Sequence, residues 1–404
     1  MSDFLNALKK QVLLGDGAMG TMLVKNGLPR GENPELWMLS HPEKIKMIHR
    51  AYLDAGSQVI LTNTFGANRL KLQEYQASCR VEEINKTAAR LAREAAGKNA
   101  FVAGTIGPTG HFPAPLGDIS WLELVQTFAE QARILEEGGV DFIFLETFSD
   151  LGEVRAALYA VKNYTSLPVA CSLTYDKGRT LTGTSPEVAA VVLSSLGADL
   201  IGANCSTGPE ELLDVMRAYR QATDLPLLVE PNAGMPELVG GETFYRKTPQ
   251  DMAAFVERFR KIGVNLIGAC CGSTPDHIRA MSSAFASRDP VTPSPRPGVL
   301  PSRLASRSRV ICLGASLPPA IIGERINPTA RKTIAQAFRN ESWDLITQEG
   351  LAKVEAGAQL LDLNVGVPGL DEVRLLSLGV RHLQMALDVP LVLDSTNPAS
   401  LEKG

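Results

Sequence analysis

The sequence predicts an α/β protein with a (β/α)8 TIM barrel, followed by the first three βα units of a second, truncated TIM-type barrel. Three observations support this fold class. Short apolar runs alternate eight times with segments of helical periodicity within residues 1–288. Nearly all of these runs end in polar or Gly-rich residues, as strands of a parallel barrel do. A segment rich in Pro, Ser and Arg then separates this series from a shorter one of the same kind.

The elements of the first series follow one another in order. Strands are expected at residues 12–18, 58–65, 101–108, 142–148, 168–175, 200–205, 226–232 and 266–271. Helices are expected at residues 43–55, 81–96, 121–137, 152–164, 187–196, 209–222, 249–262 and 275–285. The strand interiors are mainly Val, Ile, Leu and Ala, whereas their ends carry Gly, Asp, Asn, Glu and Cys. Chemistry is therefore expected at the rim formed by the strand ends.

The second series begins after a linker. Residues 289–318 form this linker, in which prolines interspersed with Ser and Arg favour a semi-rigid, solvated chain. Strands at 320–325, 360–365 and 390–394 then alternate with helices at 343–356 and 371–387. Three strands cannot close a barrel, so the expected domains are a complete barrel at 1–288 and a partial one at 319–404.

Composition excludes several classes of protein. The 404 residues are 45% hydrophobic and 21% charged, with a net charge of −4, which indicates no nucleic-acid surface. No apolar run approaches about 18 residues, so no membrane span is predicted. Six cysteines are too few for a disulfide scaffold in a chain of this length, and a cytoplasmic location is expected.

Three of the cysteines end expected strands. Cys205 ends one apolar run, and the adjacent Cys270 and Cys271 end another, directly before Gly272. Adjacent residues on a regular strand point to opposite faces, so both can face one ion only if the strand ends or bends there. Three thiolates bind Zn²⁺ well and leave a fourth position open, as in catalytic zinc sites. The alternative, that these are small buried hydrophobes, explains a Gly-flanked Cys pair poorly.

Other polar residues at the same rim could hold a substrate. Asp16 and Glu146 could accept hydrogen bonds from the ammonium group of an amino acid, although Asp16 could instead be a turn or cap residue. Thr62 and Asn63 could line the same pocket, or be merely structural. Asn232 could approach the metal when substrate is absent, and its alternative role is that of a turn residue before Gly234.

Four segments together resemble the homocysteine S-methyltransferase family, a family of zinc-binding (β/α)8 barrels. They are Gly15-Asp-Gly-Ala-Met-Gly-Thr21, Leu61-Thr-Asn-Thr-Phe-Gly66, Asn204-Cys-Ser206 and Gly268-Ala-Cys-Cys-Gly-Ser-Thr-Pro275. The resemblance covers about residues 1–288. It implies that Cys205, Cys270 and Cys271 are zinc ligands and that Asp16 and Glu146 bind homocysteine.

The second series resembles the opening of a pterin-binding methyltransferase barrel. Its segments are Ile322-Gly-Glu-Arg-Ile-Asn-Pro-Thr-Ala-Arg-Lys332, Leu361-Asp-Leu-Asn-Val-Gly366 and Leu391-Val-Leu-Asp-Ser-Thr396. A homocysteine barrel followed by a pterin barrel is similar to the order found in the cobalamin-dependent methionine synthase family. The resemblance implies pterin contacts at the strand ends, by Glu324, Asn327, Asp362, Asn364 and above all Asp394.

Together the two resemblances imply zinc-dependent methyl transfer to homocysteine, which gives methionine. The immediate donor would be methylcobalamin, carried by another domain or protein, and the ultimate donor 5-methyltetrahydrofolate. Two alternatives stay open. The first is a stand-alone homocysteine methyltransferase that uses S-methylmethionine, betaine or S-adenosylmethionine. The second is a non-enzymatic barrel that senses zinc or redox state through its cysteines.

Overall fold

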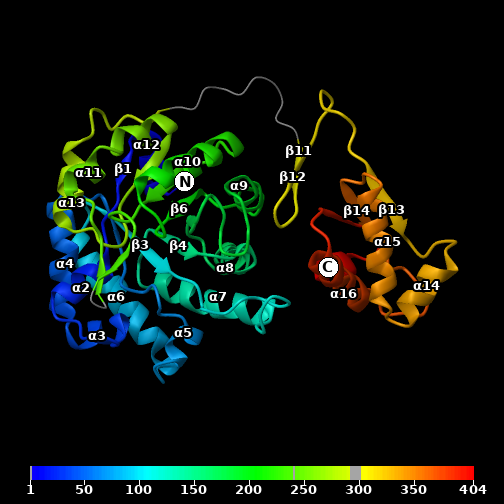
Figure 1. Cartoon of the computed structure of the whole chain (residues 1–404). Helices are drawn as coiled ribbons and strands as arrows, with labels where there is room; N and C mark the ends of the chain where they lie inside the picture. Colours follow the sequence, from blue (N-terminus) through cyan, green and yellow to red (C-terminus); the bar gives the residue numbers. More distant parts are fainter. Residues whose placement is uncertain (1, 240–241, 292–301) are drawn as a thin grey trace. The chain divides into compact units, whose positions relative to one another are not determined.

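Figure 1 shows the computed structural model of the chain, which describes residues 2–239, 242–291 and 302–404. The chain separates into two compact units, Met1–Ser294 and Pro295–Gly404. The predicted boundaries at 288 and 319 stay a prediction. No helix in the described part of the chain is long and apolar enough to cross a membrane.

The first unit is an eight-stranded parallel sheet that closes like a barrel, as the sequence predicts. Its strands are β1 (Leu13–Leu14), β2 (Val59–Leu61), β3 (Phe101–Ile106), β4 (Phe142–Phe148), β5 (Val169–Leu173), β6 (Leu200–Asn204), β7 (Leu227–Glu230) and β10 (Val264–Ile267). The order is β1-β10-β7-β6-β5-β4-β3-β2. The ends of the sheet, β1 and β2, are joined by hydrogen bonds that include Gln58 N to Leu14 O at 2.7 Å and Leu61 N to Asp16 Oδ2 at 2.9 Å.

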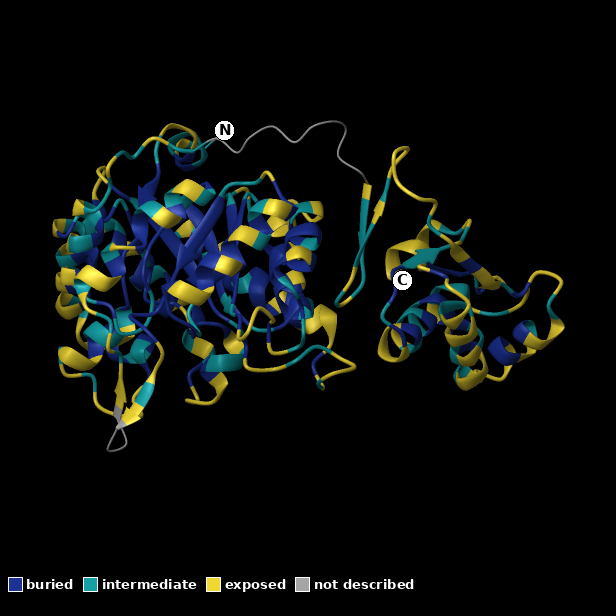
Figure 2. Cartoon of the chain, turned by 45° about the horizontal axis from the view of Figure 1, so that its top comes forward, coloured by how far each residue is buried: buried dark blue, intermediate teal, exposed yellow. Residues whose placement is uncertain are grey.

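Helices cover the outside of this sheet, and the strands between them are almost entirely buried (Figure 2). Those expected are α4 (Pro42–Asp54), α6 (Val81–Ala96), α7 (Trp121–Glu137), α8 (Leu151–Tyr164), α9 (Pro186–Ser195), α10 (Pro209–Ala222) and α13 (Pro275–Ser283). The segment at 249–262 is divided into α11 (Pro249–Ala253) and α12 (Val256–Ile262). Helix α7 is typical: Ser120 caps its first turn, and Leu124, Phe128 and Leu135 form its buried face.

Several short elements were not expected from the sequence. They are α1 (Asp3–Lys10), α2 (Met19–Lys25), α3 (Pro34–Ser40), α5 (Arg69–Gln73), the 3-10 helix η1 (Ser78–Arg80) and the hairpin of β8 (Glu237–Val239) and β9 (Glu242–Phe244). Phe4 of α1 stacks on Phe142, the first residue of β4, with ring centroids 3.8 Å apart. Phe4 shares a core cluster with Leu13 and Leu200, which begin other strands. Helix α1 therefore closes the amino end of the barrel, and the site lies at the carboxyl end.

The second unit holds a small parallel sheet of order β13-β14-β15. Its strands are β13 (Ile322–Ile326), β14 (Leu360–Leu363) and β15 (Leu391–Leu393), and its helices are α14 (Lys332–Arg339), α15 (Trp343–Glu355), α16 (Glu372–Ala386) and α17 (Pro398–Lys403). Helices α14 and α17 were not expected. An antiparallel hairpin of β11 (Ser302–Ala305) and β12 (Val310–Leu313) lies within the predicted linker, whose residues 292–301 lie outside the described part. The sheet agrees with the three predicted strands, and its assignment to a second barrel stays a prediction.

Candidate metal centre

The sulfurs of Cys205, Cys270 and Cys271 come together at the carboxyl end of the barrel. The Sγ atom of Cys271 lies 3.8 Å from that of Cys205 and 4.0 Å from that of Cys270, and all three lie within 4.8 Å of one another. Sulfurs bound tetrahedrally at about 2.3 Å from one zinc ion are about 3.8 Å apart. The spacing of the three thiols therefore fits a single zinc ion.

The backbone explains how adjacent cysteines share one site. Strand β10 ends at Ile267, so Cys270 and Cys271 lie beyond its regular alternation, and Gly272 follows with φ +82°. Cys205 also leaves its strand, with φ +59°. The segments that carry Cys205 and Cys270 are both hydrogen-bonded to the end of β7. Cys205 N donates to Glu230 O at 3.0 Å, and Cys270 N donates to Pro231 O at 2.8 Å.

The electrostatics of the cluster by itself favour one thiolate, at Cys271, while hydrogen bonding among the thiols and burial raise the pKa of Cys270 and raise that of Cys205 to about 12. The pKa of Cys271 is lowered to about 3, chiefly because the thiols of Cys205 and Cys270 donate hydrogen bonds to its sulfur. A thiolate rather than a thiol binds a metal. One sulfur of the cluster is therefore ready to bind a cation at neutral pH, and the other two lose their protons when the metal binds.

Asn232 carries a buried oxygen on a segment that is hydrogen-bonded to the cluster, since the next residue, Ala233, donates through its N to Cys271 O at 2.9 Å. Asn232 lies two residues beyond β7, the strand between the two that carry the cysteines, and its side chain is only 2% exposed. Its Oδ1 atom has no hydrogen-bond partner among the described residues. A buried amide oxygen without a partner is costly, and a fourth metal ligand is one way to satisfy it.

Three buried carboxylates surround the mouth of the barrel. Asp16, Glu146 and Glu230 are 3%, 8% and 2% exposed. Burial raises the pKa of all three, that of Glu146 to about 7, and the charge of Glu146 further raises those of the other two. Glu230 Oε1 has no hydrogen-bond partner in the described part of the chain. Such a group of acids stabilises a cation that enters it, such as an ammonium.

Comparisons with known proteins agree with this geometry. The family model described as "Homocysteine S-methyltransferase" matches residues 13–285. The chain belongs to the homocysteine S-methyltransferase family. Membership implies homocysteine as the acceptor of the methyl group and leaves the donor open.

Relatives of this methyltransferase chain are found among curated proteins and solved structures. It is 31% identical to a methionine synthase of Mycobacterium tuberculosis and 30% identical to one of Mycobacterium leprae, over its whole length but only 35% of theirs. The metallated form of the homocysteine methyltransferase MmuM from Escherichia coli is similar in fold, with a TM-score of 0.59 and 24% identity. That match covers 69% of this chain and 97% of MmuM. The apo form of MmuM gives a TM-score of 0.55 and 25% identity.

Two predicted substrate residues of the methyltransferase barrel have structural partners. Thr62 Oγ1 accepts a hydrogen bond from Thr105 N at 3.0 Å and shares another with Thr64 Oγ1 at 2.6 Å. Asn63 Nδ2 donates to Pro34 O at 3.0 Å. Both side chains are buried at the end of β2 and hold its loop in place. Their contact with substrate stays a prediction.

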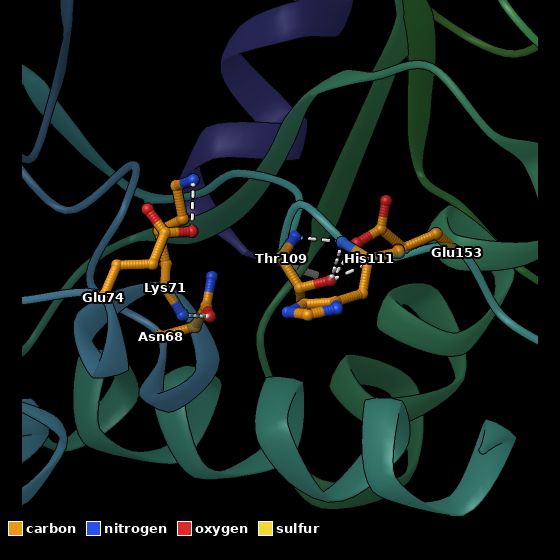
Figure 3. A network of polar contacts seen from close by, with 6 residues as sticks. All are labelled: Asn68, Lys71, Glu74, Thr109, His111 and Glu153. Atoms are coloured by element: carbon orange, nitrogen blue, oxygen red, sulfur yellow. Dashed lines mark hydrogen bonds and ion pairs between the residues drawn. The ribbon is translucent and has the colours of Figure 1, made fainter. Parts of the chain in front are cut away.

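The neighbouring loop of the methyltransferase barrel, which follows β3, is anchored by a buried acid (Figure 3). Glu153, near the start of α8, accepts hydrogen bonds from Thr109 N at 2.7 Å and Thr109 Oγ1 at 2.6 Å. Thr109 Oγ1 also accepts a bond from His111 N at 3.2 Å. Burial raises the pKa of Glu153 to about 7. This part of the rim therefore depends on a carboxyl group that titrates near neutral pH.

Tyr245 and Glu230 are residues of the methyltransferase site that sequence reasoning missed. The Tyr245 ring lies against Gly272, where an added Cβ would be 2.2 Å from Tyr245 Cγ. Nothing in the sequence connects Tyr245 to the cysteines, because a hairpin brings it there. Glu230 had a usable signal. It directly follows a wholly apolar run, as Glu146 follows Phe142–Leu145, and a buried carboxylate without a partner is costly.

The second unit also gathers polar groups at the ends of its strands. Asn364 Nδ2 donates to Asp394 Oδ2 at 2.9 Å, and Asn327 Nδ2 donates to Glu324 Oε1 at 3.2 Å. Burial, followed by the charges of Asp394 and Glu324, raises the pKa of Asp362. The five residues predicted to contact a pterin thus lie in or just after the three strands, towards their carboxyl ends. Their binding role stays a prediction.

Proposed function

We propose that the first unit transfers a methyl group to the sulfur of homocysteine, and that Cys205, Cys270 and Cys271 hold a zinc ion for this reaction. Zinc, when bound, would keep the substrate sulfur in its thiolate form at neutral pH. The thiol proton leaves to solvent, and an electron pair of the sulfur forms the new bond to the methyl carbon. The bond between the methyl group and its donor breaks, its electron pair stays on the donor, and the product is the thioether methionine. The observation that carries this proposal is the convergence of three sulfurs beside three buried acids.

The residues of the site divide the work of binding. Asn232, whose Oδ1 has no partner in the described part of the chain, would be a further ligand for zinc when substrate is absent. The substrate ammonium is accepted by Asp16, Glu146 and Glu230. Its positive charge offsets the free-energy cost of holding their negative charges away from water. Holding the thiolate and the ammonium at two fixed points orients the sulfur for attack. A barrel that senses redox state would have no use for these acids.

We further propose methylcobalamin on a separate module as the immediate donor and 5-methyltetrahydrofolate as the ultimate one. Two findings support this donor. The similarity to the mycobacterial methionine synthases extends over the whole chain, beyond the barrel. The second unit also presents Glu324, Asn327, Asp362, Asn364 and Asp394 at the ends of parallel strands, where a pterin could be hydrogen-bonded. Asp394→Asn is expected to weaken folate binding by the protein that contains this unit.

The alternative donors are small methylated molecules: S-methylmethionine, betaine and S-adenosylmethionine. They stay open because membership of the homocysteine S-methyltransferase family leaves the donor undetermined. A panel of donors mixed with the zinc-loaded protein and homocysteine decides between the two. Methionine formed only with methylcobalamin supports the proposed donor, and methionine formed from a small donor overturns it.

The thiolate itself is tested by calorimetry. Homocysteine binding at pH 7 is expected to release about one proton, because its thiol is mostly protonated in free solution. The proton appears as a binding enthalpy that changes with the ionisation enthalpy of the buffer. A binding enthalpy that is the same in all buffers would contradict thiolate formation.

A further inference from the structure

Strand β4 contains a bulge at the residue that would bind the substrate ammonium. Leu145 pairs with Cys171 of β5, and Phe148 pairs with Leu173, so β4 has one extra residue in this interval. Glu146 and Thr147 occupy the bulge, and Thr147 has φ +65°. This conformation is strained for a β-branched residue and persists only where its surroundings hold it. Bulges often redirect a side chain beside an active site.

Asn204, the last residue of β6, holds this bulge. Its Oδ1 atom accepts a hydrogen bond from Thr147 N at 2.9 Å and another from Ser172 Oγ at 2.6 Å. Its Nδ2 atom donates to Thr147 Oγ1 at 2.7 Å and to Glu146 Oε2 at 3.2 Å. The side chain is fully buried and all four of its hydrogen-bonding positions are used. A backbone N–H can only donate, so the orientation of the amide is fixed by Thr147.

We propose that Asn204 is a positioning residue that fixes the Glu146 carboxylate for the substrate ammonium and joins this subsite to the metal ligand Cys205. The inference rests on the proposed function, since Glu146 is the ammonium acceptor there. Asn204 directly precedes Cys205. Its side chain therefore fixes the position of the β4 bulge relative to Cys205. The amide accepts two hydrogen bonds and donates two at once, whereas a hydroxyl or an imidazole has only one donor when neutral.

The test compares two thiols that differ in one group. L-homocysteine carries the ammonium, whereas 4-sulfanylbutanoate has the same chain, carboxylate and thiol without it. Asn204→Ala in the zinc-loaded protein is expected to weaken L-homocysteine binding about tenfold relative to 4-sulfanylbutanoate, measured by calorimetry. Zinc content is measured alongside, and it is expected to stay at the wild-type level.

Ser172→Ala is the matched control, because it removes one buried hydrogen bond from Asn204 without touching Glu146 or Thr147. It is expected to lower the melting temperature and leave the ratio of the two dissociation constants unchanged. A second pair of proteins covers the case in which Asn204→Ala fails to fold. Thr147→Gly adopts the positive φ without strain. The double variant Thr147→Gly/Asn204→Ala is expected to prefer L-homocysteine over 4-sulfanylbutanoate less strongly than Thr147→Gly alone does.

The outcomes separate the two levels of inference. Wild-type protein that binds neither thiol would overturn the proposed function and the role of Asn204 with it. Wild-type binding of both thiols, with the same ratio in the Asn204→Ala protein, would overturn the positioning role alone. If the preference for L-homocysteine falls equally in Ser172→Ala, the loss of any hydrogen bond to Asn204 has the same effect. That result would also overturn the positioning role.

Discussion

Both units place polar side chains at the carboxyl ends of parallel strands. Only in the first unit do the strands form a barrel around these side chains. In the barrel, Asp16, Glu146 and Glu230 are buried, and burial raises the pKa of each. In the three-stranded sheet, Asp362 is buried while Asp394 and Glu324 are exposed. Water can therefore stabilise the charges of the second group, whereas the first group needs a cation or protons.

The difference explains where binding chemistry can be strong. Charges held away from water interact far more strongly with a bound ligand than charges at a hydrated edge. Burial of unpaired acids lowers the stability of the barrel. The same burial strengthens the interaction of these acids with a bound cation. In the three-stranded sheet this loss of stability falls on Asp362, whose Oδ2 also has no partner in the described part of the chain, while Asp394 and Glu324 stay hydrated.

The largest effect is expected at the cysteines. Cys270→Ser or Cys271→Ser removes one of three thiolates, and zinc content should fall from about one per chain to near zero, with methyl transfer reduced by at least about 10³-fold. Metal analysis and a methionine assay measure both. Cys79→Ser, at an exposed cysteine outside the cluster, is the control and should leave both unchanged. Methyl transfer that survives without metal would break the proposed chemistry.

The next effect concerns pH and the buried Glu153. Its pKa is raised to about 7 from 4.5, so its contribution to stability is fully present below about pH 4.5 and is lost as pH rises towards 7. The loss is on the order of 3 kcal/mol. Glu153→Gln keeps an acceptor for Thr109 and removes the titration, so its barrel should lose less stability between pH 5 and pH 8 than the wild type.

Unfolding of both proteins at the two pH values measures this difference. Glu187→Gln changes an exposed acid on α9 and should follow the wild type. If Glu153→Gln loses as much stability between the two pH values as the wild type does, the carboxyl group is not buried as the structure shows.

A smaller effect is expected at Gly272, where backbone and packing act together. Gly272→Ala places a Cβ 2.2 Å from Tyr245 Cγ at φ +82°, and should cost about 2–3 kcal/mol in stability and weaken zinc binding. Gly178→Ala is a matched control, because Gly178 has φ +75° with no atom within 4 Å of an added Cβ. It should cost only about 1 kcal/mol. Equal losses would show that Tyr245 does not support the site.

The smallest effect compares the two units directly. Glu230→Gln removes a buried acid that has an unpaired oxygen and a raised pKa, so folding no longer requires it to bind a proton; it should stabilise the barrel by about 1–2 kcal/mol while weakening homocysteine binding. Asp362→Asn makes the same kind of change in the three-stranded sheet and should alter stability by less. Denaturation and calorimetry measure the two quantities. A larger gain from Asp362→Asn would reverse the contrast between the units.

Much of the fold could be predicted because each strand of the barrel is a short apolar run with polar residues at its end. The convergence of the three cysteines also followed from their places at strand ends. The positions of Asn204 and Tyr245 could not be predicted. Asn204 acts through a bulge at Thr147 on another strand, and Tyr245 reaches Gly272 through a hairpin. Both depend on contacts between segments distant in sequence, which local patterns do not contain.

The central claim is that three cysteines hold zinc and that homocysteine sulfur becomes its fourth ligand. X-ray absorption at the zinc edge tests this most directly, on the purified chain before and after L-homocysteine is added. The account predicts one zinc per chain, bound by three sulfurs and one lighter atom at first and by four sulfurs afterwards. A sulfur count that does not change on adding homocysteine, or no zinc under reducing conditions, would contradict it.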